Sequence, residues 1–348
     1  MNFLATRPLY IGQNNQGASI ASGGDVTVGM NIELVDTWSG HNTTSASWQT
    51  YYCQAPGWYL AECAAPFAYT GATQYVFAVG FSAVTAGVSV PVVRGQLQLN
   101  ASGHHPEPKT CDLIEQAVSG PVGGGGDSIT MTALQATGSS LAYSATSTVY
   151  VNQSIRWVCA TSGTQPLIVP ANAAWPAPPA YITPAMLNTG IRDTIAFLTY
   201  PPIMRAYYTP GSVTIPSQAF PAGTVVNLGS VTVDNYGGFT TGASGGYTAP
   251  VAGLYFCYGQ VNFASYGTSS GVAYSAGLNV NGGTIQWGDS VFSDLSNTSG
   301  AGAVVRRRLR LNAGDFVQFC AQQSTSGSLA LNTTAANQTR FLVVWECA

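Results

Sequence analysis

Charged side chains are scarce in this chain of 348 residues. Aspartate, glutamate, lysine and arginine together make up 7% of the sequence, and the formal net charge is −3. This balance excludes a basic surface of the kind that holds nucleic acid, and it excludes an acidic tail. No run approaches the roughly 18 continuous apolar residues of a membrane-spanning helix. We therefore expect no nucleic-acid binding and no membrane insertion.

Residues that commonly carry chemistry are also few. The only histidines are His41, His104 and His105, and no GxSxG, HExxH, CxxC or P-loop pattern accompanies them. A catalytic nucleophile needs a base within reach, so we expect no catalytic residues, no cofactor and no enzymatic activity. A glycosidase would need two carboxylates across a cleft, and the sequence singles out no pair among its 14 acidic residues.

Metal ligation and disulfides have weak support. The segment HHPEPKTC at 104–111 contains residue types that can ligate zinc, but two prolines stiffen it and an exposed loop is the simpler interpretation, so we expect no metal site. The N-terminal MNFLATRPLYIG lacks the features of a secretory signal. Synthesis in a reducing cytoplasm and an odd number of seven cysteines favour buried thiols.

The sequence has instead 40 glycines, 19 prolines and 11% aromatic residues, a composition typical of many short strands joined by tight turns. It also repeats itself. When 314–348 is shifted back by 188 positions it aligns without gaps on 126–160, and twelve positions are identical, among them Trp157 with Trp345 and Cys159 with Cys347. The two copies run from about 7 to 160 and from about 205 to 348.

Period-two alternation predicts strands within each copy. In GLYFCYGQVNFA (253–264), Leu254, Phe256 and Tyr258 point to one side, and Tyr255 and Cys257 point to the other. Further strand candidates are VTVDN, AYSAGLNVNG, VVRRRLRLN, DFVQFCAQQ and RFLVVWECA. About eight to ten such strands per copy suit an all-β jelly roll or two-sheet sandwich. We expect an N-terminal domain at 1–160 and a C-terminal domain at 205–348.

The intervening 161–204 reads as a proline-rich linker followed by one short helix. Thr183 and Pro184 suit a helix start, and Leu187, Ile191, Ile195 and Leu198 recur at helical spacing as one apolar stripe. A helix of this length is marginal alone. The stripe therefore needs a partner, which is either its own domain or copies of the helix from other subunits on a symmetry axis.

The segments YTAPVAGLYFCYGQVNFA (247–264), GLNVNGG (277–283) and LRLNAGDFVQF (309–319) resemble the C1q/TNF-like jelly roll, whose members usually assemble as trimers. The first copy keeps this pattern more loosely. LNTGIRDTIAFLTYPP (187–202) followed by such a domain looks like the minor tail proteins of phages that infect actinobacteria. The ratio of ten arginines to one lysine, Lys109, agrees with a GC-rich genome.

The resemblance implies a homotrimer in which aromatic residues of one sheet face the symmetry axis. We therefore predict Tyr59 and Tyr255 at a trimer interface, and Trp157 and Trp345 at the interface or in the core. Ordinary core packing is the alternative for each of them.

Three arginines of the run RRRLR, Arg306, Arg308 and Arg310, share one face of a predicted strand. They form either a solvated outer face or contacts with carboxylates or an anionic glycan across a subunit interface. Two pairs of aspartates recur at matching positions of the copies, Asp127 with Asp315 and Asp36 with Asp234, and we expect them to cap turns.

The functional expectation is a structural virion protein. It would be a trimeric minor tail protein, at a tail tip or fibre, that contacts other phage tail proteins and helps adsorption to a host cell-wall glycan or surface receptor. Two alternatives stay open, a capsid decoration or head-fibre protein and a tail-associated polysaccharide-degrading enzyme. The expected location is the virion tail.

Overall fold

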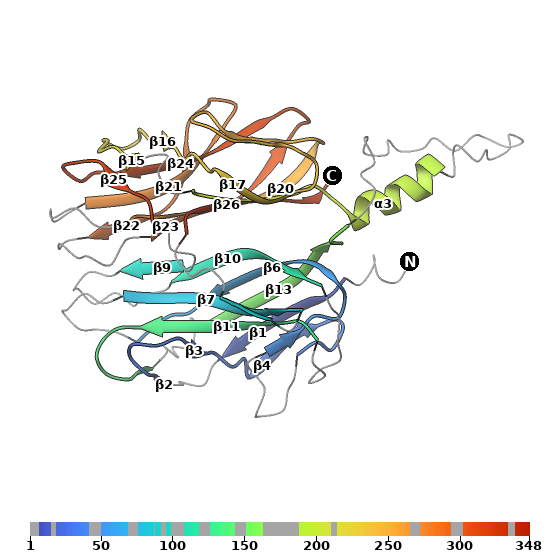
Figure 1. Ribbon diagram of the computed structural model, residues 1–348, viewed down its shortest axis with the longest axis horizontal. Coiled ribbons are helices and arrows are strands. Elements are labelled where there is room, and N and C mark those ends of the chain that lie inside the picture. Colours follow the sequence, from blue (N-terminus) through green and yellow to red (C-terminus); the bar gives the residue numbers. More distant parts are fainter. Residues whose placement is uncertain are drawn as a thin grey trace, which may run out of the picture.

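The computed structural model describes residues 7–14, 19–41, 50–68, 76–86, 88–91, 95–98, 108–117, 126–142, 151–162, 188–209, 214–264, 272–293, 302–332 and 338–348. They form two β-sandwiches, one above the other in Figure 1, with a short helix at one end. Within this part of the chain, no helix is long and apolar enough to span a membrane.

The first domain, drawn in blue to green in Figure 1, packs a five-stranded sheet against a six-stranded one. The five-stranded sheet has the order β10 (Lys109–Gln116), β6 (Gly57–Ala64), β13 (Val151–Cys159), β1 (Leu9–Asn14), β4 (Ile32–Asp36). The other sheet contains β3 (Val26–Thr27), β11 (Ser128–Gln135), β7 (Val76–Thr85) and β8 (Val88–Pro91), with β5 (Thr50–Tyr52) beside β11 and β9 (Gly95–Gln98) beside β7. The short strands β2 (Ser19–Ile20) and β12 (Leu141–Ala142) pair separately.

The second domain repeats this plan. Its first sheet has the order β23 (Gly302–Leu311), β20 (Gly253–Asn262), β26 (Arg340–Cys347), β14 (Ile203–Tyr207), β17 (Ser230–Asp234). Its second sheet contains β22 (Gln286–Ser293), β21 (Val272–Val280), β24 (Phe316–Gln323), β19 (Gly246–Thr248) and β18 (Phe239–Thr240), with β16 (Thr224–Val225) beside β24. A bridge between β22 and β23 joins the two sheets, and β15 (Thr214–Ile215) pairs with β25 (Leu329–Ala330).

The two domains therefore share one topology. The order β10-β6-β13-β1-β4 in the first corresponds strand for strand to β23-β20-β26-β14-β17 in the second, and every pairing within these sheets is antiparallel. The predicted all-β fold of two tandem two-sheet sandwiches is confirmed, and the described residues contain one short helix.

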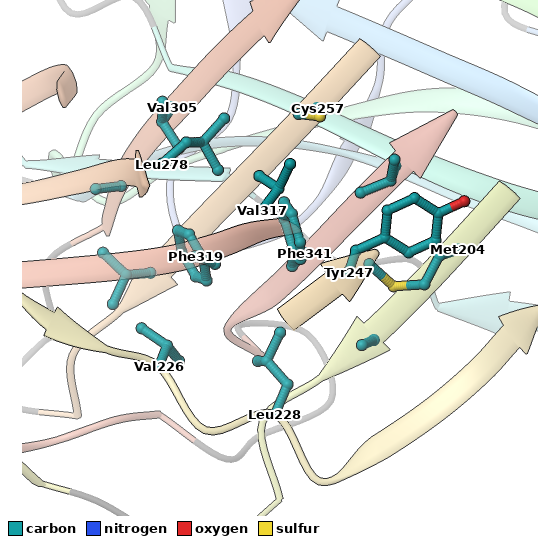
Figure 2. Close-up of a cluster of buried hydrophobic side chains, with 14 of the residues drawn as sticks. Met204, Val226, Leu228, Tyr247, Cys257, Leu278, Val305, Val317, Phe319 and Phe341 are labelled. Carbon is teal, nitrogen blue, oxygen red and sulfur yellow. The ribbon is translucent and has the colours of Figure 1, made fainter. Parts of the chain in front are cut away.

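Each domain encloses its own hydrophobic core between its two sheets. Figure 2 shows part of the second core, in which side chains from both sheets point toward one another. The labelled residues are Met204, Val226, Leu228, Tyr247, Cys257, Leu278, Val305, Val317, Phe319 and Phe341. The alternation predicted for β20 places Tyr255 and Cys257 in this core, as expected for a strand with one face on each side of a sheet.

A glycine and a tryptophan fix the start of β6 in the first domain and of the equivalent strand β20 in the second. Gly57 has φ of +152° and lies against the indole of Trp157, whereas Gly253 has φ of +156° and lies against Trp345. A Cβ at either glycine would lie 2.2 or 2.3 Å from the indole Nε1. This close approach requires glycine, and its recurrence shows that the repeat extends to local geometry.

The helical segment consists of a π-helical turn η1 (Asn188–Arg192) and α3 (Asp193–Thr199). Phe197 is its anchor, because its ring packs edge-on against Trp345 with centroids 4.8 Å apart. Leu198 is also packed against this core, as predicted, but Ile191 and Ile195 are 42% and 38% exposed. The predicted stripe was therefore only partly right, and Leu187 lies outside the described residues.

Candidate functional site: the junction between the domains

The four aromatic residues predicted at a trimer interface lie in the cores of their own domains. Tyr59 and Tyr255 are 0% exposed, and Trp157 and Trp345 are also buried. Each tyrosine hydroxyl donates to a backbone carbonyl four residues earlier, at 2.7 Å. These side chains have no surface left for a partner subunit, so the core alternative applies to all four.

The opposite faces of the same strands form a third hydrophobic cluster. It joins the two domains, because it contains side chains of β6, β10 and β13 from the first and of β14, β20 and β26 from the second. Figure 1 shows these two sheets facing each other. The members are Trp58, Leu60, Cys111, Leu113, Val158 and Cys159, with Ile203, Phe256, Tyr258, Leu342 and Val344. The aromatic interface thus lies within one chain.

A completely buried arginine crosses this junction. Arg340, the first residue of β26, is 0% exposed. Its guanidinium donates to the carbonyl of Cys111 from Nε at 3.1 Å and from Nη2 at 2.9 Å, and to the hydroxyl of Thr110. It also lies over the ring of Tyr258, 5.7 Å from the centroid. These contacts attach β26 of one domain to β10 of the other.

Beside it lies a buried ion pair. The Nη2 atom of Arg205 is 2.8 Å from Oδ2 of Asp112, whose side chain is fully buried. The other carboxylate oxygen accepts a hydrogen bond from the amide of Leu113. Burial lowers the pKa of Arg205, and the negative charge of Asp112 opposes that shift. The pair therefore links β14 of the second domain to β10 of the first.

The arginines of β23 take part as well. Arg306 and Arg308 are on its outer face, as predicted, together with the exposed Arg310. Arg306 pairs with Glu62 of the first domain at 2.8 Å, and Arg308 donates to Glu346 at 2.7 Å. The expected contacts with carboxylates are therefore present for two of the three, but within a single chain.

Glu346 is shared between the domains, because Arg156 of the first domain also donates to it, at 2.6 Å. Burial alone would raise the pKa of Glu346, but the hydrogen bonds and charges of Arg308 and Arg156 lower it below its ordinary value. The guanidiniums of Arg156, Arg306 and Arg308 also lie within 5.5–5.9 Å of the ring centroid of the buried Phe256.

A cavity of about 340 Å³ opens at the same junction. The first domain contributes side chains from β1, β6, β10 and β13, and the second contributes β20 and β23. Its lining is formed by Ile11, Glu62, Cys63, Ala64, Lys109, Thr110, Cys111, Asn152, Gln153, Ser154, Tyr258, Val304 and Arg306. It combines an aromatic ring, small apolar groups, amides, hydroxyls and both signs of charge, the mixture typical of a small-molecule site.

Three of the four recurring aspartates, Asp36, Asp234 and Asp315, cap local turns as predicted, whereas Asp127 accepts from the amides of Ala86 and Ala117, which are distant in sequence. Asp36 accepts from the amides of Trp38 and His41, and Asp234 accepts from those of Gly238 and Phe239. Asp127 and Asp315 likewise accept backbone N–H groups, and hydrogen bonds lower the pKa of Asp315.

The remaining candidate residues are the histidines and the cysteines. His41 is buried, stacked on Tyr10 with its Nδ1 3.4 Å from Glu33. His104 and His105 lie outside the described residues, and the described ones contain no cluster of three or more metal-ligating side chains. All seven cysteines are free thiols, of which six are buried and Cys347 is exposed.

Sequence reasoning missed Arg340, Arg205, Asp112 and Glu62. One signal was available for Arg340, because it opens an otherwise apolar strand and aligns with Asn152 of the first copy. No local pattern marks the other three, since their partners are distant in sequence.

No family model and no curated protein sequence matches the chain. Among solved structures, the globular domain of zebrafish complement 1qA is similar, with a TM-score of 0.30 and 13% identity over 43% of this chain and 95% of that one. Murine APRIL at pH 8.0 is similar with a TM-score of 0.29 and 14% identity, covering 42% of this chain and 98% of that one.

Proposed function

We propose that this chain is a non-enzymatic structural protein of a phage virion, a self-associating minor tail protein that contributes to adsorption to the host cell surface. The observation that carries the proposal is the buried junction between the domains. An Asp112–Arg205 pair, the buried Arg340 and an apolar cluster join them. Relative motion of two domains is the default unless their interface is large and hydrophobic, and a junction with a shared apolar cluster and buried ion pairs suits a rigid pair that displays binding surfaces.

The helix supports self-association. Figure 1 shows α3 projecting away from the two sandwiches. Ile191, on the preceding turn η1, and Ile195, on α3, are both exposed. Its C-terminal end is fixed, because Arg7 donates to the carbonyl of Leu198 and Phe197 contacts Trp345. Copies of this helix around a threefold axis would bury the isoleucines, which the chain leaves in water. The outer faces of the five-stranded sheets are already occupied, because they pack against each other within the chain.

Trimerisation matters for adsorption because three weak sites on one particle bind far more firmly than one. A chain with only 7% charged residues suits recognition of neutral polymers by hydrogen bonds and aromatic contacts.

Light scattering tests the assembly. We expect about three times the chain mass of 36.1 kDa for the full chain, and a monomer for the double variant Ile191→Gln/Ile195→Gln. Val231→Gln is the matched control, because Val231 is 40% exposed on β17 rather than on the helix. A monomeric wild-type chain, or an unchanged mass in the double variant, contradicts this assembly.

Electron microscopy of virions labelled with gold-conjugated antibody against the chain tests its location. Gold on tails is expected, and gold on heads would favour a capsid decoration or head fibre. The purified chain should also bind host cells without releasing reducing sugar from their envelope. Release of sugar would favour the polysaccharide-degrading alternative.

A further inference from the structure

We propose that the cavity at the domain junction binds an anionic saccharide unit, held through a carboxylate or phosphate substituent. The saccharide assignment rests on the proposed adsorption function, whereas the anionic character rests on the side chains around the cavity. Its lining residues come from both domains, so the site exists only when the junction is formed.

The first argument is an uncompensated buried charge. Arg340 is 0% exposed and, among the described residues, no carboxylate forms a salt bridge with it. Its Nη1 atom is buried and has no hydrogen-bond partner in this part of the chain. A buried cation normally needs an opposite charge. The three residues that Arg340 touches, Thr110, Cys111 and Tyr258, all line the cavity, so an anion bound there would lie near this charge.

The second argument is the charge balance of the surroundings. Two cationic side chains, Lys109 and Arg306, line the cavity together with one carboxylate, Glu62. Behind the wall, the buried cations Arg205 and Arg340 face a single buried carboxylate, Asp112. Arg306 pairs with Glu62 and Arg205 pairs with Asp112, whereas no salt bridge of the described residues involves Arg340. The positive charge of Arg340 therefore acts on the cavity, and the low-dielectric walls of a cleft strengthen its potential.

The shape and the neutral groups specify a sugar rather than a bare ion. A volume of about 340 Å³ lies in the range of small-molecule pockets and far exceeds what an inorganic anion fills. The hydroxyl of Ser154 and the side-chain amide of Asn152 are groups of the types that bind sugar hydroxyls. Ile11, Val304 and the ring of Tyr258 supply apolar contact.

The two copies contribute different kinds of side chain to the cavity. When the strand register is counted from the equivalent glycines Gly57 and Gly253, Glu62 of the first copy corresponds to Tyr258 of the second. In the same way, Lys109 of the first copy corresponds to Val304 of the second. The polar member of each pair comes from the first domain and the apolar member from the second. Divergence of the copies has therefore put both kinds of side chain around one cavity.

Isothermal titration of the full chain in low-salt buffer tests the proposal with three probes, glucuronic acid, glucose 1-phosphate and glucose. We expect at least one anionic sugar to bind with a dissociation constant of about 1 mM or tighter and neutral glucose not to bind. Preference between the two anions distinguishes carboxylate from phosphate recognition. Failure of both, or equal binding of glucose, overturns the proposal.

The deciding variant is Lys109→Met, which removes the charge of an exposed side chain and keeps its length. Affinity for the anionic sugar should fall at least tenfold. Arg310→Met is the matched control, because Arg310 is exposed on β23 but does not line the cavity, and its affinity should not change. Equal affinities in both variants would show that the sugar binds elsewhere.

Host-cell binding by the same variants separates this inference from the proposed function. If the sugars bind and Lys109→Met loses them, yet the variant adsorbs to cells as the wild type does, the cavity assignment stands and its role in adsorption fails. If Lys109→Met loses both sugar binding and adsorption to host cells, the result supports the cavity assignment and its role in adsorption.

Discussion

The two domains share a scaffold but present different outer faces. Both have the same strand order and the same contact of glycine with tryptophan. At corresponding positions of the paired sheets, however, the first domain has Asn152 and Arg156 where the second has Arg340 and Val344. The cores were preserved while the faces between the domains diverged.

This difference explains how two copies of one fold meet within a single chain. The first domain contributes carboxylates, Glu62 and Asp112, and the second contributes the arginines that bind them, Arg306 and Arg205. Identical faces would place like charges opposite each other, which is unfavourable. Duplication into one chain removed that constraint, because each copy has only one partner face to fit.

The largest expected effect tests whether the two cores are equivalent. Trp157→Ala and Trp345→Ala should each lower the free energy of unfolding by about 3 to 5 kcal/mol, and Trp345→Ala should cost more because it also removes the contact with Phe197. Phe220→Ala is the control, since Phe220 is 62% exposed, and should cost less than about 1 kcal/mol. Urea denaturation measures all three. A tryptophan variant no worse than the control would refute core burial at that position.

The next largest effect tests the sheet faces at the domain junction, where the two copies differ. Asp112→Ala leaves Arg205 buried without its carboxylate partner and should cost about 3 kcal/mol. Asp193→Ala removes a carboxylate from an exposed pair with Arg192 and should cost less than about 0.5 kcal/mol. Similar denaturation midpoints for the two variants would mean that the junction contributes little to stability.

A smaller effect depends on pH. Glu346 has its pKa lowered below the ordinary 4.5 in the folded chain, so its contribution to stability is present above that value and is lost as the pH falls through the folded pKa. Glu346→Gln should therefore cost about 1 kcal/mol at pH 7, and the difference from wild type should shrink below about pH 4.5. A difference that stays constant between pH 7 and pH 3 would contradict the shared ion pair.

The smallest effect leaves stability unchanged. Burial raises the pKa of Cys320 to about 12 and raises those of the other buried thiols as well. A thiol reagent should therefore modify about one cysteine per native chain, the exposed Cys347, and all seven after denaturation. Cys347→Ser should abolish the native reaction. Rapid labelling of a second thiol would show that one domain opens locally.

The sequence was sufficient for the fold because strand alternation and the repeat are local signals. It was not sufficient for the interface. The period-two alternation of β20 places Tyr255 and Cys257 on one face of the strand and Phe256 and Tyr258 on the other. Because both sets are apolar and aromatic, the pattern does not indicate which set faces the core. The prediction chose the wrong set for the tyrosines.

The charged junction could not be read from sequence for a different reason. Arg340 and Thr110 are 230 positions apart, and Arg205 and Asp112 are 93 apart. Each pair joins one domain to the other, so a pattern within either copy contains no sign of it. The helix was half predicted, because the stripe of Ile191 and Ile195 was recognised while Phe197, which anchors α3, lies off that stripe.

Differential scanning calorimetry of the full chain tests the central claim most directly, which is that the two jelly rolls form one body through their paired sheets. We predict a single unfolding transition whose calorimetric and van't Hoff enthalpies agree. Two separate transitions in the wild-type chain, one for each domain, would contradict the account.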